Sequence, residues 1–150
     1  MPQSLALNVI HLVYSTKART ACLPQDTRSE LFAYKSGILA QWDCSSIAIG
    51  GVADHVHVLF LLSKNHALAK VVEEVKKGSS KWLKRQQTSI ASFHWQYGYG
   101  AFSVSSSNVE KVRQYVQSQE ERHAKQSFQD ELRELLTRHG VPFDERYVWD

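Results

Sequence analysis

The sequence predicts one domain, residues 1–150, built from both helices and strands (α/β in the broad sense, and α+β in the narrower classification). Its expected fold is a ferredoxin-like split βαβ. Its length of 150 residues suits a single domain with its own hydrophobic core. Hydrophobic residues make up 43% and charged residues 22%, as in ordinary folded proteins. The apolar patterns follow the order strand, helix, strand, strand, helix, strand. This order predicts an antiparallel sheet covered by helices on one face, with two extra helices left over at the C-terminal end.

The first half of the chain contains the first three predicted strands. Leu5–Tyr14 is rich in Val, Leu and Ile and is predicted to be a strand. A helix with mixed apolar and charged positions follows Pro24 and runs to about Asp43. Ser46–Val52 is the second predicted strand. Asp54–Leu62 is the third, and its far end is apolar on both faces, as expected for a central strand.

Apolar residues recur at intervals of three and four in the next segment, Ala67–Gln87, which predicts a second core-facing helix. The aromatic segment Phe93–Val104 is expected to be a loop that leads into a strand.

The last third of the chain is predicted to be helical. Ser107 and Glu110 have the spacing of a capping box, for a helix from Asn108 to about His123. A final helix, Phe128–Arg138, is followed by glycine and proline, which end helices. The aromatic residues of the last ten positions suggest a tail that docks on the domain.

Charge and targeting signals limit the possible environments. The net charge of +3 permits a polyanionic partner without requiring one. Met1–Ser15 lacks the pattern of a signal peptide, so a cytoplasmic location is expected. The longest apolar run, Val58–Leu62, is far shorter than the roughly 20 residues that cross a bilayer, so no membrane segment is expected. Cys22 and Cys44 are interpreted as free thiols without a function.

The pair His55 and His57 lies at the start of the predicted central strand. Because side chains alternate across a strand, both imidazoles project from one face and can grip a metal at two points. Two satisfied histidines on a half-exposed strand are an equally good interpretation of this pair alone.

Tyr115 and Gln119 are four residues apart on a predicted helix, so they share a helical face. An amide oxygen suits Mg²⁺ or Mn²⁺, and a tyrosine hydroxyl can form a covalent bond to phosphate. The alternatives are a partly buried tyrosine and a solvated glutamine, and both are common on amphipathic helices.

The sequence resembles the single-tyrosine HUH transposases of the insertion-sequence 200/605 group, in which two histidines flank a bulky apolar residue. The resemblance covers nearly the whole chain in order: HLVYSTKAR at 11–19, DHVHVLF at 54–60, KGSSKWL at 77–83, WQYGYGAFSV at 95–104, YVQSQ at 115–119, and then Phe128, Glu131 and 143–150. A His-x-His pair is unspecific alone, but its combination with a later Tyr-x-x-x-Gln is specific.

The resemblance implies that His55, His57 and Gln119 bind one divalent metal, Mg²⁺ or Mn²⁺, and that Tyr115 attacks the DNA phosphate. The products are a 5′-phosphotyrosine and a free 3′-hydroxyl, which allow strands to be rejoined without ATP. The implied partner is single-stranded DNA, with hairpin ends as the expected substrate. Family members are homodimers, and the tyrosine helix of one subunit can complete the metal site of the other.

The roles of three nearby residues are left open, among them whether His123 or Glu120 assists the metal. His123 is expected on the helix surface, and the same holds for Glu120. Asp54 alternates away from the histidines, so a position in a turn is expected, with a hydrogen bond to a ligand imidazole as the alternative.

Several basic residues are candidates for contact with DNA phosphates. The candidates are Lys17, Arg19, Lys77, Lys81 and Lys84. A solvated helix face is an equal alternative for the lysines, since two glutamates dilute the charge. Aromatic residues of the segment 95–99 are expected either to stack on unpaired bases or to pack in the core.

Two other function classes fit the same pattern. A non-catalytic single-stranded nucleic-acid-binding module on this scaffold would not need Tyr115. A metal-dependent hydrolase would use water at the His55 and His57 site and form no protein-linked intermediate.

Overall fold

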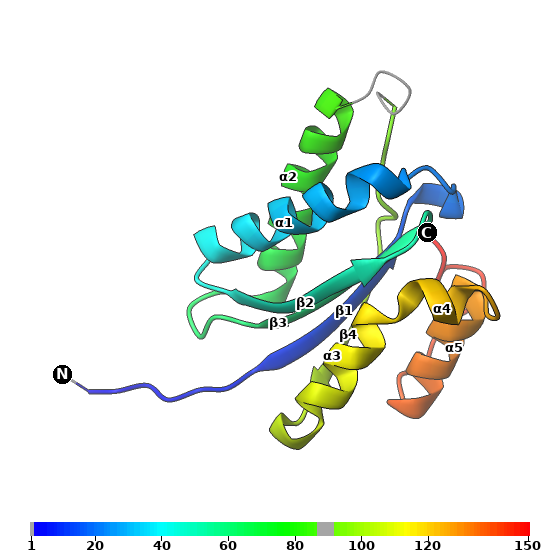
Figure 1. The fold of residues 1–150 in the computed structure, drawn as a ribbon. Helices are drawn as coiled ribbons and strands as arrows, with labels where there is room; N and C mark the ends of the chain where they lie inside the picture. The colour runs from blue at the N-terminus through cyan, green and yellow to red at the C-terminus, as the bar shows by residue number, and fades with distance from the viewer. Residues whose placement is uncertain (1, 87–91) are drawn as a thin grey trace.

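The chain forms a four-stranded antiparallel sheet with helices on both faces (Figure 1). A computed structural model describes residues 2–86 and 92–150. The strand order is β2-β3-β1-β4, with β1 and β3 in the centre. The strands are β1 (Val9–Ser15), β2 (Ser45–Gly51), β3 (His55–Leu61) and β4 (Gly100–Val104). This arrangement confirms the predicted split βαβ fold.

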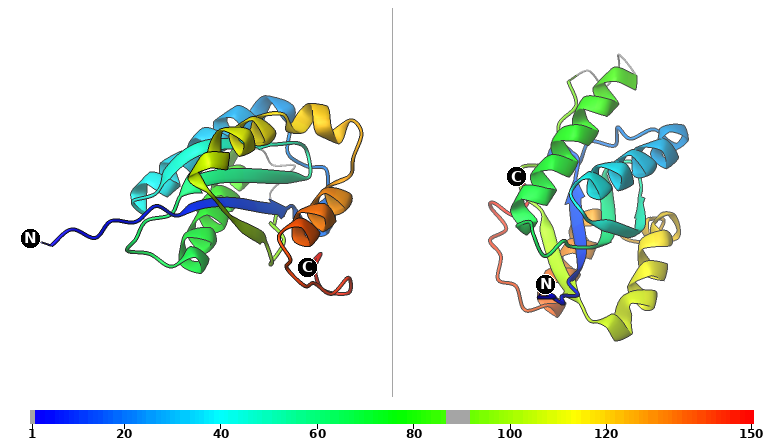
Figure 2. Two further views of the ribbon diagram at one scale, coloured as in Figure 1. Left: turned by 90° about the horizontal axis from the view of Figure 1, so that it is seen from below. Right: turned by 90° about the vertical axis from the view of Figure 1, so that its left-hand side faces the viewer.

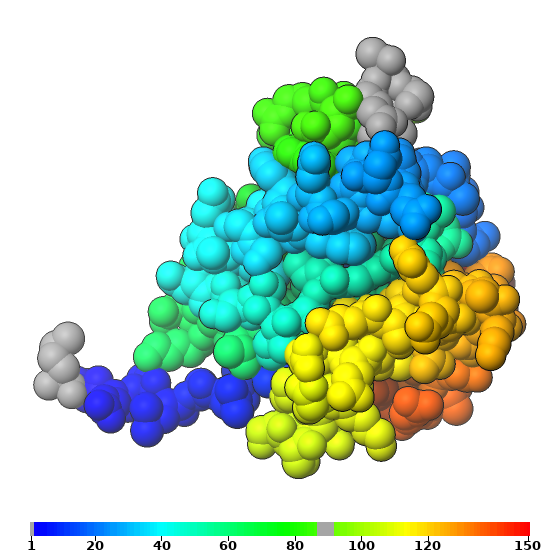
Figure 3. Space-filling model, in the orientation of Figure 1, coloured from blue at the N-terminus to red at the C-terminus, as the bar shows by residue number. Residues whose placement is uncertain are grey.

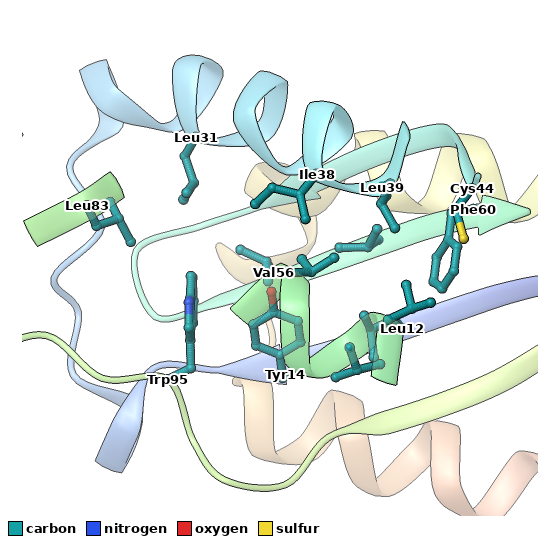
Figure 4. Close-up of a cluster of buried hydrophobic side chains, with 14 of the residues drawn as sticks. Leu12, Tyr14, Leu31, Ile38, Leu39, Cys44, Val56, Phe60, Leu83 and Trp95 are labelled. Atoms are coloured by element: carbon teal, nitrogen blue, oxygen red, sulfur yellow. The ribbon is translucent and has the colours of Figure 1, made fainter. Parts of the chain in front are cut away.

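Helices α1 (Gln25–Gln41) and α2 (Leu68–Gln86) cover one face of the sheet and enclose the larger core. Alternate residues of the central strands point to this face, among them Tyr14 and Phe60, and meet Leu39 of α1 (Figure 4). Each fully buried side chain of this size stabilises the fold by about 1.5–3 kcal/mol. The predicted helix Ala67–Gln87 corresponds to α2, and its expected last residue, Gln87, lies outside the described residues.

The two helical segments left over in the predicted order cover the opposite face (Figures 1 and 2). They form α3 (Val109–Gln117), α4 (Gln119–His123) and α5 (Phe128–Arg138). The alternate residues of β1 and β3 face these helices, so this second face carries the histidines of β3 as well as two smaller apolar clusters.

Glycine allows α3 to pack closely against β2. A Cβ atom added at Gly50 would lie 2.1 Å from the backbone oxygen of Val116, which is fully buried. No side chain fits there, so this contact fixes the height of α3 above the sheet. The helix that carries Tyr115 is therefore held by direct backbone contact with β2.

Three local expectations differ from the structure. Leu5 and Leu7 do not extend the first strand, because β1 begins at Val9, the first residue paired with β3. The capping box at Ser107 is wrong, since a short 3₁₀ helix (Ser106–Asn108) precedes α3 and Asn108 makes no side-chain cap. The predicted single helix to His123 breaks at Ser118, which separates α3 from α4.

The C-terminal tail docks on the domain, as predicted, and the structure places it on the second face. Trp149 packs near Phe128 of α5, with ring centroids 6.3 Å apart. The backbone oxygen of Asp150 accepts hydrogen bonds from the Gly98 N–H at 2.9 Å and from the Gln96 amide at 3.3 Å. Across residues 2–86 and 92–150, no helix has both the length and the apolar character needed to cross a bilayer.

Candidate metal and nucleophile site

His55 and His57 lie at the start of β3, on the face that α3, α4 and α5 cover. Their rings are 5.3 Å apart and both side chains are fully buried. The structure therefore places the pair on one face of a central strand, but inside the domain and not at a half-exposed edge. A histidine in such a position needs a polar partner for each ring nitrogen.

Gln119 reaches this pair from the first position of α4, despite the helix break at Ser118. Its amide nitrogen donates to the backbone oxygen of Tyr115 at 3.2 Å, which turns its Oε1 toward the histidines. Oε1 lies 3.4 Å from the Nε2 atom of His55. Gln119 is only 2% exposed, so the surface interpretation of this glutamine is wrong.

Glu131 of α5 and His123 of α4 join the same cluster, which the sequence interpretation missed. Glu131 Oε1 lies 2.9 Å from His57 Nε2, 3.0 Å from His123 Nε2 and 3.4 Å from His55 Nε2. One ligand atom from each of these four residues lies within 4.8 Å of every other. The expectation that His123 lies on the helix surface is wrong, because its side chain is only 8% exposed and the turn after α4 brings Glu131 of α5 against the ring.

A sequence signal for Glu131 does exist. It shares an apolar helix face with Phe128 and Leu135, which are spaced for a core-facing helix. A carboxylate rarely occupies such a position without a buried partner. His123 follows Gln119 by four residues, the spacing that also links Tyr115 and Gln119.

Each of the three imidazoles is anchored through its other nitrogen. His55 Nδ1 lies 2.7 Å from the Asp54 carboxylate, and His123 Nδ1 lies 2.6 Å from the Gln126 backbone oxygen. His57 Nδ1 lies 2.8 Å from Nε2 of His11, a buried residue of β1. Burial and the adjacent His57 lower the pKa of His11 to about 3, so His11 is neutral and its Nε2 atom is able to accept this hydrogen bond in the Nδ1–H tautomer.

We therefore assign the Nδ1 hydrogen to all three rings, which leaves three Nε2 lone pairs directed at the oxygens of Glu131 and Gln119. Histidine ligands of metals are commonly held in this way, with the outer nitrogen bonded to a carboxylate or carbonyl. Asp54 is thus more than a turn residue. It fixes the orientation of the His55 ring.

The chemistry of this donor set fits a divalent cation. Lone pairs of nitrogen and oxygen that face one another at about 3 Å repel unless a proton or a cation lies between them. When no cation is bound, protons on the imidazoles take its place: burial raises the pKa of Glu131, but hydrogen bonds donated by protonated His123, His55 and His57 outweigh it and hold that pKa far below its usual value. Glu131 is consequently an anion in an enclosed site, where a cation is strongly favoured.

Tyr115 lies beside this cluster and is tied to it. Its hydroxyl donates a hydrogen bond to Oε2 of Glu131, the carboxylate oxygen that does not face the imidazoles. The ring packs edge-on against His57, with centroids 5.7 Å apart. Burial, and then the charge of Glu131, raise the pKa of Tyr115 well above its usual value. Tyr115 and Gln119 both contact the histidines of their own chain.

The basic residues predicted to bind DNA lie in two other places. Lys17 and Arg19 belong to the 3₁₀ helix η1 (Lys17–Arg19), where Lys17 lies 5.5 Å from the centroid of the exposed Tyr97 ring. Lys77, Lys81 and Lys84 lie on α2, across the sheet from the histidines. The structure does not bring these lysines to the metal and nucleophile site, and their DNA contacts stay a prediction.

The aromatic segment divides between the two expected roles. Trp95 is buried and its indole N–H donates to the Ser79 hydroxyl at 3.0 Å, so it belongs to the core. Tyr97 and Tyr99 are 83% and 41% exposed, so both rings remain open to contact from outside.

Comparison with known proteins adds the family. Residues 5–119 match the family model described as "Transposase IS200 like". A proposed transposase of Deinococcus radiodurans R1 has a similar structure, with a TM-score of 0.62 and 21% identity over 77% of this chain and 95% of that chain. A REP-associated tyrosine transposase, solved with a REP hairpin, gives a TM-score of 0.56 and 11% identity over 77% of this chain and 70% of that chain.

Likeness at these identities supports the shared fold alone, and no curated protein gives a significant match. The family match is the stronger finding, because the matched segment contains the histidine pair, Tyr115 and Gln119 in their expected order. The chain therefore belongs to the IS200-like transposase family.

Proposed function

We propose that this transposase cuts and rejoins single-stranded DNA, with Tyr115 as the nucleophile and one divalent metal at the adjacent cluster. His55, His57 and Gln119 hold the metal, and His123 and Glu131 complete the ligand set. One observation carries the proposal. The carboxylate of Glu131 faces three imidazole Nε2 atoms with one oxygen and accepts the Tyr115 hydrogen bond with the other.

A bound divalent metal would supply Lewis-acid polarisation of the scissile phosphate. The rest of the chemistry belongs to the side chains. The Tyr115 oxygen attacks phosphorus while the bond from phosphorus to the 3′-oxygen breaks. The phenol proton passes to Glu131 Oε2, which already accepts its hydrogen bond, and Glu131 then returns this proton to the departing 3′-oxygen. The products are a 5′-phosphotyrosine and a 3′-hydroxyl, and attack by another 3′-hydroxyl reverses the step and joins new ends.

The ligand set also bears on which metal is used. Mg²⁺ prefers oxygen ligands and retains water, whereas imidazole nitrogen suits transition metals. Three histidines, one carboxylate and one amide oxygen thus favour Mn²⁺ over Mg²⁺. The expectation from the sequence is either Mg²⁺ or Mn²⁺. The additional ligands His123 and Glu131, which that expectation does not include, favour Mn²⁺.

Single-stranded DNA with hairpin ends remains the proposed substrate. The support is the family itself and the similar structure, which was solved with a REP hairpin bound to that protein. The homodimer implied by the family stays a prediction.

The test is a covalent adduct between protein and DNA. The protein is incubated with Mn²⁺ and labelled single-stranded hairpin DNA, and the products are separated on a denaturing gel. We expect an adduct for the wild type and for Tyr147→Phe, a matched change at an exposed tyrosine, and none for Tyr115→Phe.

Two other outcomes would overturn the proposal. Tight binding without an adduct in the wild type identifies a non-catalytic nucleic-acid-binding module. Cleaved DNA without any protein-linked product identifies a hydrolase that uses water.

A further inference from the structure

A pocket with a volume of about 640 Å³ opens beside Tyr115, between α3, the end of β4 and the last turn of α5. This volume lies within the roughly 300–1,000 Å³ typical of ligand pockets. In Figure 3, α3 in yellow and α5 in orange lie side by side on the face in view. Tyr115 and His11 form part of the pocket wall, so the pocket meets the nucleophile and a residue that anchors His57.

The lining of this pocket is positively charged. Lys111, Arg122 and Arg138 line it, and among the described residues that form its wall none is acidic. The remaining polar positions are serine, asparagine, glutamine and histidine, which are all able to donate hydrogen bonds to phosphate oxygens. An anionic ligand is therefore the class that this pocket suits.

Within residues 2–86 and 92–150, none of these three cationic side chains makes an ion pair with a carboxylate. Outward-facing arginines of the same helices are different. Arg113 of α3 pairs with Glu110, and Arg133 of α5 pairs with Glu145. The charges that border the pocket are thus the ones left available for a partner.

Arg122 has the most specific position. Its guanidinium carbon lies 4.2 Å from the centroid of the Tyr115 ring. Its Nε atom is enclosed and has no hydrogen-bond partner among the described residues. An enclosed donor without an acceptor is costly, and an oxyanion beside it would remove that cost. The forked donors of arginine match phosphate oxygens in pairs.

We propose that this pocket binds the sugar-phosphate backbone of single-stranded DNA, with Arg122 on the scissile phosphate and with Lys111 and Arg138 on the phosphates that flank it. This inference rests on the proposed function of Tyr115. It assigns the substrate strand a path on the second face of the sheet, away from the lysines of α2.

The test measures binding without cleavage. Arg122→Gln and Arg138→Gln are each made in a Tyr115→Phe background, and their affinity for a labelled single-stranded oligonucleotide is measured by fluorescence anisotropy in EDTA over a series of salt concentrations. Lys125→Gln is the matched control, because Lys125 is exposed and close in sequence but does not line the pocket.

We expect each pocket variant to bind at least about threefold more weakly at low salt. The slope of log K against log salt should also decrease by roughly 0.7 for each phosphate that the variant no longer neutralises. The control should change neither. If an Arg122→Gln protein fails to fold, Arg122→Lys keeps the charge, removes the paired donors and is expected to show an intermediate decrease in affinity.

The inference is overturned if the pocket variants show the affinity and salt slope of Lys125→Gln. The adduct assay with Tyr115 intact separates this result from failure of the proposed function. Weaker binding in the pocket variants with no wild-type adduct supports the pocket and refutes the nucleophile. A wild-type adduct with pocket variants that bind like the control refutes the pocket alone.

Discussion

The hydroxyl of Tyr115 on α3 donates a hydrogen bond to the carboxylate of Glu131 on α5. The other oxygen of that carboxylate faces His57, His123 and His55. A single side chain thus fixes the distance between the nucleophile and the proposed metal. Any change at Glu131 is expected to affect both.

Replacement of Glu131 by glutamine tests its place in the ligand set. Glu131→Gln keeps the shape but removes the anionic ligand, so affinity for Mn²⁺ should decrease at least about tenfold, since loss of even an outer partner of a metal ligand costs roughly 10- to 100-fold. Isothermal titration calorimetry measures this change. Glu134→Gln, at an exposed position of the same helix, is the control and should bind like the wild type. If Glu131→Gln and Glu134→Gln bind Mn²⁺ with equal affinity, Glu131 is not a ligand of the metal.

The nitrogen-rich ligand set predicts a preference among metals. If Mn²⁺ binds ten times more tightly than Mg²⁺ at equal, near-saturating concentration, it stabilises the folded protein by about 1.4 kcal/mol more. For a chain of this size that difference raises the unfolding temperature by roughly 3–6 °C more than Mg²⁺ does. Differential scanning fluorimetry is the measurement. The same shift in a His57→Gln variant would show that the metal binds elsewhere.

The close contact between β2 and α3 predicts opposite effects for two glycines. Gly50→Ala places a Cβ atom 2.1 Å from the Val116 backbone oxygen, so α3 must shift and the free energy of unfolding should decrease by about 2 kcal/mol or more. Gly37→Ala lies within α1 with open space around it and should raise the free energy of unfolding by about 0.5–1 kcal/mol. Urea denaturation distinguishes the two. If Gly50→Ala leaves the free energy of unfolding unchanged, the contact between Gly50 and Val116 does not fix the distance between α3 and the sheet.

Stability should depend on pH through a buried lysine on the opposite face of the sheet. Lys35 is fully buried, its ammonium donates to the Tyr14 hydroxyl, and none of the carboxylates in the described part of the chain pairs with it. Burial, and then the charge of Lys76, hold the pKa of Lys35 well below its usual value. Between this lowered pKa and the unfolded value of about 10.4, the unfolded chain therefore binds more protons than the folded protein, and the free energy of unfolding increases with pH in that window.

Lys35→Met removes this group, so the variant should be more stable at pH 7, by about 1–2 kcal/mol, and less dependent on pH between 7 and 9.5. Urea denaturation at the two pH values measures both effects. Lys77→Met, at an exposed position of α2, should keep the wild-type dependence on pH. If the free energy of unfolding of Lys35→Met depends on pH as steeply as that of the wild type, the Lys35 amine is not the cause of this pH dependence.

The fold and half of the candidate site follow from local patterns. The alternation of a strand placed His55 and His57 on one face, and the helical repeat placed Tyr115 near Gln119. The sheet order also follows, because strands and helices alternate in the sequence as they do in a split βαβ unit. These are relationships between residues that are close in sequence.

The rest of the site depends on contacts between distant segments. Glu131 reaches His57 only because the turn after α4 folds α5 back over the sheet, and His11 reaches His57 through the pairing of β1 with β3. The break at Ser118 is likewise set by packing, since the segment from 108 to 123 has no strong helix breaker. No periodic pattern encodes these contacts, although an acidic residue on an apolar helix face was a usable signal.

The enclosure of the ligands has a practical consequence for anyone who purifies this transposase. His55 and His57 are fully buried and Glu131 is only 1% exposed, so we expect an ion bound at the proposed site to enter or leave only when the helices over it move. Exchange with the surrounding buffer is then limited by that opening motion, and a chelator acts no faster than the opening allows. If the cluster holds a metal as proposed, the ion found in a fresh preparation is expected to be the one that was bound while the chain folded.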